Sequence, residues 1–281
     1  NLGASVDTKT LLGMLHKAKS KGGEALAEFY AKHLNVEIGL NLRNDRWAGA
    51  DLWEAQGRPE MAGLDYLLEN CDVVTTGIDG GGLDDLLGFA VIGRLKSLPD
   101  SWLVWFKAWA NQIVLERRKQ IAPLLLDFQK AGDLTVVENV GEEHDQLAEL
   151  LVRLRDSGKL GGIGLDPWRS SVILNALNGH GFADDDVTGV AQGARLYDDI
   201  DMAEQRLGAG SLYHSNQPMM AWCVANAKAE RRGNSILITK QSAGIAKIDP
   251  LIAMFCAVNL MRQNPEPSGG LDAFLNDIVI A

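Results

Sequence analysis

Residues 71–110 read CDVVTTGIDGGGLDDLLGFAVIGRLKSLPDSWLVWFKAWA, and this stretch decides the fold. It holds three apolar runs rich in β-branched and aromatic residues, separated by short connections with Gly, Asp, Ser and Pro. Apolar runs bounded by turn residues are typical of strands, and short connections favour antiparallel neighbours. We therefore expect strands at 71–79, 86–95 and 101–110 that form a three-stranded meander.

Helices and strands alternate after this meander. Helical spacing of apolar residues predicts helices at 112–131, 144–157, 168–178, 196–208, 218–230 and 249–263. Shorter apolar runs predict strands at 133–139, 161–167, 187–192 and 235–240. Three strands followed by alternating helix and strand predict an α/β fold with a mixed sheet flanked by helices, the order of the ribonuclease H-like fold.

The rest of the chain bounds the domain organisation. Residues 1–40 carry apolar residues at helical spacing, interrupted by Gly22 and Gly23, and 41–70 read as irregular with short helices. We expect a leading helical segment over 1–68 and the ribonuclease H-like domain over 69–281. The 281 residues include no apolar run long enough to span a bilayer, so we expect no membrane contact.

Charge and cysteine content exclude some classes of protein. The formal net charge is −10, whereas a domain that binds nucleic acid by itself is usually basic. A site built from several carboxylates adds negative charge that bound metal ions would neutralise. The three cysteines are scattered and form no CxxC pair, which argues against a disulfide framework or a structural zinc site.

The glycines in GIDGGGLDD allow two interpretations. Gly80, Gly81 and Gly82 resemble a loop whose backbone N–H groups cradle a phosphate, as in a sugar kinase-like or acetate kinase-like ATPase. That interpretation needs Thr or Ser soon after the glycines and a second Asp-x-Gly loop, and the sequence places Leu-Asp-Asp after the glycines instead. The alternative is a strand end that presents a carboxylate to a metal ion.

Four aspartates lie at the boundaries of predicted elements. Asp79 ends the first strand, Asp85 opens the second, Asp166 ends a later strand, and Asp249 opens the last long helix. Clustered carboxylates repel one another unless a cation joins them, and Mg²⁺ prefers oxygen ligands. Two such ions can hydrolyse a phosphodiester. Alternatively, Asp166 and Asp249 each precede proline and have the sequence of a helix N-cap.

The chain resembles the nuclease domain of tailed-bacteriophage terminase large subunits, the motors that package phage DNA. The resemblance rests on GIDGGGLDDLLGFAVIG (77–93), GLDPWRSSVILNAL (164–177), LYHSNQPMMAWCVANA (212–227) and ITKQSAGIAKIDPLIAMFCAV (238–258). Within it, an ordered set of family residues appears as His214, Asn216, Pro218, Trp222 and Asn226.

The resemblance implies an endonuclease that cuts concatemeric double-stranded DNA with two Mg²⁺ or Mn²⁺ ions, in the cytoplasm of a bacterial host of a phage or prophage. It implies that Asp79, Asp166 and Asp249 are metal ligands. The auxiliary candidates are Asp85 or Asp84 as a further ligand, Lys240 and Lys247 as contacts to phosphate or as a solvated pair, and His214 as a residue near the site or a structural histidine.

The resemblance departs from a complete large subunit in one respect. No GxxxxGK[ST] motif occurs, so we expect an isolated nuclease domain or a truncated prophage remnant whose ATPase domain is absent. DNA, that ATPase domain, the small terminase subunit and the portal protein are the expected partners. A catalytically inactive packaging remnant is the other alternative, although it would be expected to lack one of the aspartates. A junction resolvase, ribonuclease H or transposase core would use the same metal chemistry.

Overall fold

The computed structural model describes residues 8–21, 29, 45–82, 84–168, 170–233, 235–240 and 246–269. The chain divides into two compact units, Asn1–Arg46 and Trp47–Ala281. The first unit contributes helix α1 (Thr8–Lys21), which lies inside the predicted leading segment. Among the described helices, none has both the length and the apolar character needed to cross a membrane.

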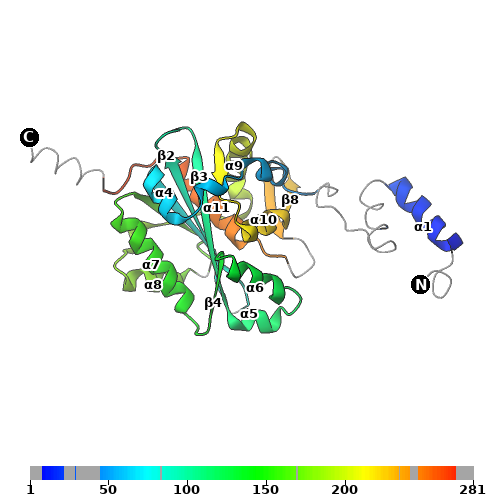
Figure 1. Ribbon diagram of the computed structural model, residues 1–281, viewed down its shortest axis with the longest axis horizontal. Helices are drawn as coiled ribbons and strands as arrows, with labels where there is room; N and C mark the ends of the chain where they lie inside the picture. The colour runs from blue at the N-terminus through cyan, green and yellow to red at the C-terminus, as the bar shows by residue number, and fades with distance from the viewer. Residues whose placement is uncertain are drawn as a thin grey trace, which may run out of the picture. The chain divides into compact units, whose positions relative to one another are not determined.

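A mixed sheet forms the centre of the second unit (Figure 1). Strands β1 (Cys71–Gly80), β2 (Leu87–Leu95) and β3 (Trp102–Asn111) form the predicted antiparallel meander. The other strands join it in parallel. β5 (Leu160–Leu165) pairs with β1, β6 (Val187–Gly189) pairs with β5, and both β4 (Leu134–Val137) and β7 (Leu212–His214) pair with β3. The strand order is therefore β4-β3-β2-β1-β5-β6, with β7 also beside β3.

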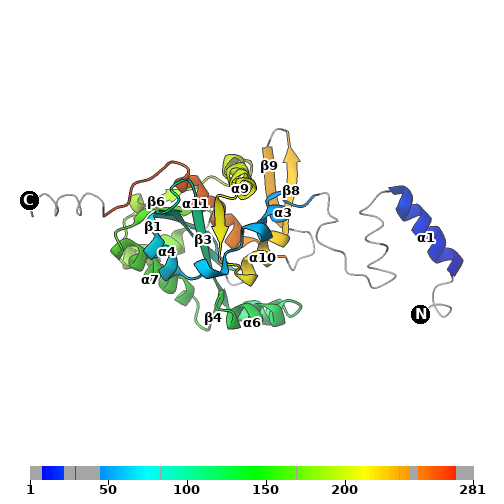
Figure 2. The ribbon, with the colours of Figure 1, turned by 45° about the horizontal axis from the view of Figure 1, so that its top comes forward.

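Helices cover both faces of the sheet. Their bounds are α3 (Gly49–Trp53), α4 (Leu64–Asn70), α5 (Gln112–Arg117), α6 (Ala122–Lys130), α7 (Glu142–Asp156), α8 (Ser171–Gly179), α9 (Tyr197–Ala209), α10 (Pro218–Ala225) and α11 (Asp249–Met261). Short 3₁₀ turns, such as Gly193–Leu196, connect some of them. A separate hairpin, β8 (Ala227–Arg232) and β9 (Ser235–Lys240), lies beside α9 and α10 (Figure 2).

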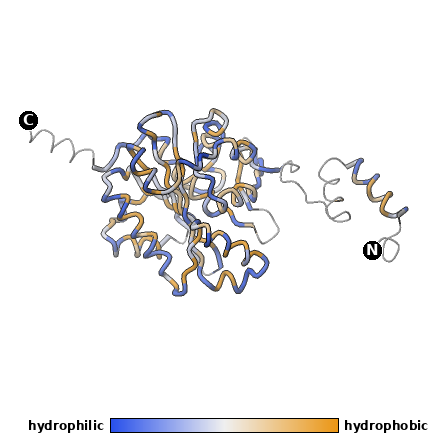
Figure 3. The backbone as a smooth tube through the Cα atoms, in the orientation of Figure 1, coloured by the Kyte–Doolittle hydropathy of each residue, from blue (hydrophilic) through white to orange (hydrophobic). Residues whose placement is uncertain are grey.

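Two apolar clusters fill the two faces because side chains alternate along each strand. On β2, Phe89 and Val91 join the cluster under α4, α7 and α8, whereas Ala90 and Ile92 join the cluster under α9, α10 and α11. Trp47 and Trp53 are buried in the second cluster, so residues 47–68 belong to this unit. Along the tube, the central strands are mostly orange or white, and the outer helices alternate orange and blue (Figure 3).

Helix α11 approaches the sheet unusually closely, and three glycines permit the approach. A Cβ atom at Gly77 of β1 would lie 1.9 Å from the carbonyl oxygen of Ala253, and one at Gly88 of β2 would lie 2.5 Å from the carbonyl carbon of Asp249. At Gly164 of β5, a Cβ would lie 2.9 Å from the carbonyl oxygen of Cys256. Glycine commonly marks such close backbone contacts. These positions let the first residue of α11 reach the strand ends.

Two predicted helices differ from the structure. The helix predicted at 112–131 is interrupted after Arg117 and resumes at Ala122, since Pro123 has no N–H to donate and fits the first turn of a new helix. The helix predicted at 218–230 ends at Ala225, and the following residues form β8, which pairs with β9. Cross-strand pairing there outweighs the helical spacing. The short strand β7 was not predicted.

Candidate metal centre

Asp79 and Asp166 lie at neighbouring strand ends. Ile78 of β1 pairs in parallel with Leu165 of β5, and each aspartate follows one member of that pair. The backbone N–H of Asp166 donates to the carbonyl oxygen of Ile78 at 3.2 Å. The Asp166 carboxylate does not cap α8, where Ser170 holds the N-cap position; its Oδ1 accepts the backbone N–H of Trp168 at 2.9 Å in a tight turn.

Asp249, at the start of α11, lies close to the end of β1 that carries Asp79. It is the first residue of α11 and Ile248 holds the N-cap position, so the carboxylate is not a helix cap. A Cβ atom at Gly80 would lie 3.2 Å from Oδ1 of Asp249, which places this carboxylate against the turn after β1. Asp249 is buried, and its Oδ2 has no hydrogen-bond partner among the described residues. A buried, unpaired carboxylate oxygen is expensive unless a proton or a cation joins it.

The glycines form a tight turn between β1 and β2. Gly80 and Gly81 have φ of +84° and +96°, values that side chains disfavour. The N–H of Gly81 donates to the carbonyl oxygen of Leu86 at 2.9 Å, and the N–H of Asp85 donates to that of Gly82 at 3.1 Å. These two N–H groups serve the turn and are not aimed at an anion. Gly80–Gly82 therefore form the connection between β1 and β2 and do not have the arrangement of a phosphate loop.

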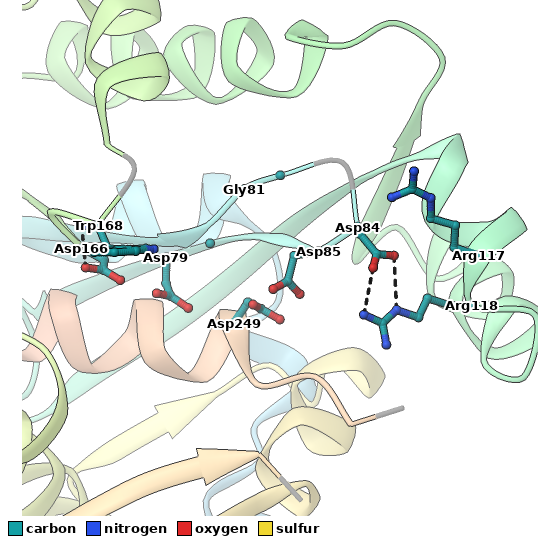
Figure 4. Close-up of a pocket in the computed structure, with 11 residues that line it drawn as sticks. Asp79, Gly81, Asp84, Asp85, Arg117, Arg118, Asp166, Trp168 and Asp249 are labelled. Atoms are coloured by element: carbon teal, nitrogen blue, oxygen red, sulfur yellow. Dashed lines mark hydrogen bonds and ion pairs between the residues drawn. The ribbon is translucent and has the colours of Figure 1, made fainter. Parts of the chain in front are cut away.

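A pocket of about 670 Å³ collects the predicted acidic residues. Figure 4 shows five carboxylates in a row across it: Asp166, Asp79, Asp249, Asp85 and Asp84. Two arginines stand at the Asp84 end of the row and Trp168 stands at the Asp166 end. The predicted carboxylates come from three separate segments of the chain, and the structure brings these segments together at one pocket.

Burial and mutual repulsion oppose ionisation of the central carboxylates. Burial, followed by the charges of Asp249, Asp166 and Asp85, raises the pKa of Asp79 well above its usual range. Burial and the charge of Asp85 raise the pKa of Asp249 to about 7, although Lys247 and Lys240 oppose the shift. Both carboxylates would lose this penalty on contact with a cation.

Asp85 differs because two lysines neutralise it. The ammonium group of Lys247, only 1% exposed, donates to Oδ1 of Asp85 and to the carbonyl oxygen of Asp84. Lys240 lies 3.8 Å from Oδ2 of Asp85. Burial raises the pKa of Asp85, but the hydrogen bond and charge of Lys247, and the charge of Lys240, more than offset it and leave this pKa below its usual value. The interpretation of Lys247 as a solvated lysine is wrong.

Asp84 and His214 are both engaged by other groups, Asp84 at the edge of the pocket and His214 outside it. Asp84 forms a two-point ion pair with Arg118, whose Nε and second guanidinium nitrogen lie 3.3 and 3.2 Å from its two oxygens (Figure 4). His214 ends β7, is buried against the ring of Trp53 at 4.0 Å between centroids, and has its Nε2 2.8 Å from the Trp53 carbonyl oxygen. His214 does not line the carboxylate pocket.

Sequence reasoning missed three residues of this pocket: Arg117, Arg118 and Trp168. The two arginines begin an Arg-Arg-Lys run in an acidic chain, and this local charge contrast was the available signal. Trp168 lies two residues after Asp166, inside a motif that the sequence analysis quoted without giving the indole a role. Its 77% exposure, which only the structure reveals, sets it apart from the other tryptophans.

The donor set of the pocket fits a hard divalent cation. As arranged here, the described residues contain no group of three or more His, Cys, Asp or Glu side chains that could hold a metal ion by itself. The pocket nevertheless offers only oxygen donors near its centre, including the unpaired Oδ2 of Asp249. Burial and repulsion raise the pKa of Asp79 and of Asp249 alike, so a cation would relieve both.

Comparison with known proteins gives matches at the level of structure. No protein-family model and no curated protein sequence matches the chain. The HK97 bacteriophage large terminase is similar with a TM-score of 0.61 at 18% identity, over 92% of this chain and 51% of that chain. The large terminase nuclease from thermophilic phage G20c (TM-score 0.48, 13% identity, 77% and 98% covered) and the large terminase nuclease domain from bacteriophage SPP1 with bound Mn (0.42, 15%, 73% and 94%) also match.

The similarity to the HK97 large terminase shows the fold. Over the matched region the chain has the mixed-sheet fold of that protein, which confirms the predicted ribonuclease H-like arrangement. It spans about half the length of the HK97 large terminase.

Proposed function

We propose that this chain is a metal-dependent endonuclease that cleaves double-stranded DNA during the packaging of a phage genome. The observation that carries the proposal is the meeting of Asp79, Asp166 and Asp249 in one pocket, from two neighbouring strand ends and a helix start. Three carboxylates that converge on a ribonuclease H-like sheet are suited to phosphodiester hydrolysis. The shared fold with a phage large terminase agrees with this substrate.

In this proposal, Asp79, Asp166 and Asp249 hold two Mg²⁺ or Mn²⁺ ions, which would activate a water and stabilise the leaving oxygen. Asp85 is a fourth candidate ligand, but its ion pairs with Lys247 and Lys240 already neutralise the negative charge that would attract a cation. The lysines lower the net negative charge of the pocket, which favours approach of the phosphate backbone. The Gly80–Gly82 turn adds no side chain to the pocket.

The partners belong to the same proposal. Translocation needs an ATPase, which in the packaging motor would be an ATPase domain connected through the part of the predicted leading segment that lies before Trp47. The small terminase subunit and the portal protein would hold and guide the DNA. Cutting would take place in the bacterial cytoplasm.

The kinase-like alternative fits the pocket poorly. A triphosphate placed at Gly80–Gly82 would face the carboxylates of Asp79, Asp85 and Asp249, and the N–H of Gly81 is already bonded within the turn. We expect calorimetry to show no saturable ATP binding. Micromolar affinity for ATP would favour the kinase-like function instead.

The proposed activity is tested with the 281-residue chain, supercoiled plasmid and Mg²⁺ or Mn²⁺. We expect conversion to nicked and linear DNA, complete loss of cutting in excess EDTA, and loss of at least roughly a hundredfold in Asp79→Asn and Asp249→Asn, since each removes an oxygen anion that would hold a metal ion. Asp127→Asn is the matched control, because Asp127 lies on α6 with its carboxylate exposed and paired with Lys130. Equal cutting by all four proteins would reject the assignment.

Metal binding has a second readout that does not depend on activity. If Mn²⁺ binds the folded chain at Asp79 and Asp249, it raises the unfolding temperature of the wild type and of Asp127→Asn in proportion to the logarithm of its concentration. Asp79→Asn should lose most of this response. A response of equal size in Asp79→Asn would place the ion elsewhere.

A further inference from the structure

Two side chains at opposite ends of the carboxylate row are exposed to solvent and lie outside the apolar core. Trp168 stands beside Asp166 and is 77% exposed, and Arg117 stands beyond Asp84 (Figure 4). Both line the same pocket as the proposed metal ligands. Because Trp168 and Arg117 lie at opposite ends of this pocket, a ligand that contacts both must be an extended molecule such as a polymer.

Trp168 is held in place at the rim. Its backbone N–H donates to Oδ1 of Asp166 at 2.9 Å, and Oγ of Ser170 donates to the carbonyl oxygen of Pro167 at 3.1 Å. The turn therefore fixes the backbone of Trp168 relative to the Asp166 carboxylate. An aromatic side chain on a fixed backbone loses little conformational freedom on binding, so its large apolar surface is well suited to a ligand contact.

Trp168 also lines a second hollow. This hollow, of about 330 Å³, shares Asp166 and Trp168 with the carboxylate pocket and is also lined by Pro167, Gln192 and Arg195. A polymer bound along the carboxylate row would therefore have a further hollow next to the indole. The guanidinium of Arg195 there is suited to a phosphate oxygen.

Arg117 is an exposed arginine at the other end of the row. Arg118 is engaged by Asp84, whereas no ion pair or hydrogen bond of the Arg117 guanidinium occurs among the described residues. Lys119 follows in the sequence, so this rim is basic in a chain with 37 acidic and 27 basic residues. Arginine binds phosphate oxygens through two parallel N–H groups, which makes an exposed arginine beside a carboxylate row suited to a phosphodiester backbone.

We propose that Trp168 and Arg117 hold one strand of the DNA duplex across the carboxylate row, with the indole packed on the sugar of one nucleotide and the guanidinium bound to a phosphate on the other side of the cleavage position. This inference rests on the proposed nuclease function, and it assigns substrate contacts that the metal ligands do not make. A contact of this kind is independent of sequence, because every nucleotide has a sugar and a phosphate.

The test measures DNA binding in EDTA, where no cutting occurs. A double-stranded oligonucleotide of about 20 base pairs, long enough to cover the site, is titrated against the full chain while acrylamide quenches tryptophan fluorescence. The other six tryptophans are buried or half-buried, so Trp168 dominates the quenched signal. We expect DNA to protect this signal, and we expect Trp168→Phe to abolish the protected component while keeping most of the affinity.

Affinity provides the second measurement. Trp168→Ala should weaken binding roughly tenfold, because it removes a large aromatic contact from the interface. Arg117→Gln should weaken binding less at moderate salt, and should lower the slope of log affinity against log salt by about one. Lys130→Gln, which removes an exposed cation on α6, is the matched control and should change affinity and slope little.

The outcomes separate this inference from the proposed function. If the wild type cuts plasmid with Mn²⁺ but DNA leaves the Trp168 signal unprotected, or if Trp168→Ala and Arg117→Gln bind like Lys130→Gln, the inference is wrong and the nuclease function stands. If DNA protects Trp168 of the wild type from acrylamide but the wild type never cuts DNA, the proposed contacts stand and the nuclease function is rejected.

Discussion

The buried ammonium group of Lys247 is bound to the carboxylate of Asp85. Lys247 lies two residues before the candidate ligand Asp249 in the chain. Its second acceptor is the carbonyl oxygen of Asp84. Lys247 is 1% exposed, and burial of an ammonium group is expensive unless such partners replace its water. The pair therefore ties the segment before α11 to the turn after β1, and holds both sides of the proposed metal centre together.

The first prediction concerns the stability of this pair. Lys247→Met removes the hydrogen bond and charge that Lys247 gives to Asp85, whose carboxylate is 38% exposed, so it should lower the free energy of unfolding by roughly 2 kcal/mol. Urea denaturation followed by circular dichroism measures the change. Lys240→Met is the matched control, because Lys240 is half-exposed and lies 3.8 Å from Asp85, and should lower the stability by less than about 1 kcal/mol. Equal effects of the two substitutions would contradict a buried pair at Lys247.

The second prediction concerns the pH dependence of the metal-free domain. Burial and the charge of Asp85 raise the pKa of Asp249 to about 7, above the model-peptide value of 3.8 that describes the unfolded chain. The folded state therefore holds a proton that the unfolded state has lost, and the stability contributed by this group is present below pH 4 and is lost as the pH rises to about 7. Asp249→Asn should make the EDTA-treated domain more stable at pH 8 by roughly 2–4 kcal/mol.

Urea denaturation of the wild type and Asp249→Asn at several pH values measures this difference. The stability difference should be small near pH 4 and should grow up to about pH 7. Asp127→Asn, with an exposed carboxylate on α6, is the control for loss of one negative charge. A stability difference that is constant over this range would mean that Asp249 is ionised without penalty in the folded state.

The sequence predicted the meander and the carboxylate positions well for physical reasons. Unbroken apolar runs between turn residues specify strands, and Asp79 and Asp166 each end such a run. The partner choices of the side chains were not predictable, because they depend on contacts between distant segments. Arg118 binds Asp84 across 34 positions of sequence, Lys247 binds Asp85 across 162, and His214 binds the Trp53 carbonyl across 161.

The third prediction concerns the glycine that allows α11 to approach β1. Gly77→Ala would place a Cβ atom 1.9 Å from the carbonyl oxygen of Ala253, so the helix must move away from the strand. We expect a loss of stability of roughly 3 kcal/mol or more, in line with overpacked cores, and a large loss of DNA cutting because Asp249 moves with the helix. Gly179→Ala is the matched control, since a Cβ there meets no atom within 4 Å and alanine favours the helix. Stability equal to that of the control would contradict the close approach.

The fourth prediction concerns His214, which was a candidate for the site and which the structure buries against Trp53. Its Nε2–H donates to the Trp53 carbonyl oxygen, and its Nδ1 accepts the backbone N–H of Asn216 at 3.2 Å, so the neutral ring satisfies both contacts. Burial lowers the pKa of His214 to about 4, although the Trp53 carbonyl opposes the shift. The unfolded chain therefore takes up a proton before the folded chain does.

The sign follows from that order of protonation. The stability contributed by neutral His214 is present above about pH 6.5 and is lost as the pH falls to about 4, by roughly 3 kcal/mol in total. His214→Gln keeps a donor and an acceptor but does not titrate. The free energy of unfolding of this variant should therefore fall less steeply with falling pH, and the difference in slope from the wild type should correspond to at most about one proton. Urea denaturation at half-unit intervals of pH measures the slope, and plasmid cutting at pH 7.5 should stay within about threefold of wild type, since a structural residue makes no transition-state contact. A hundredfold loss of cutting at unchanged stability would instead return His214 to the catalytic site.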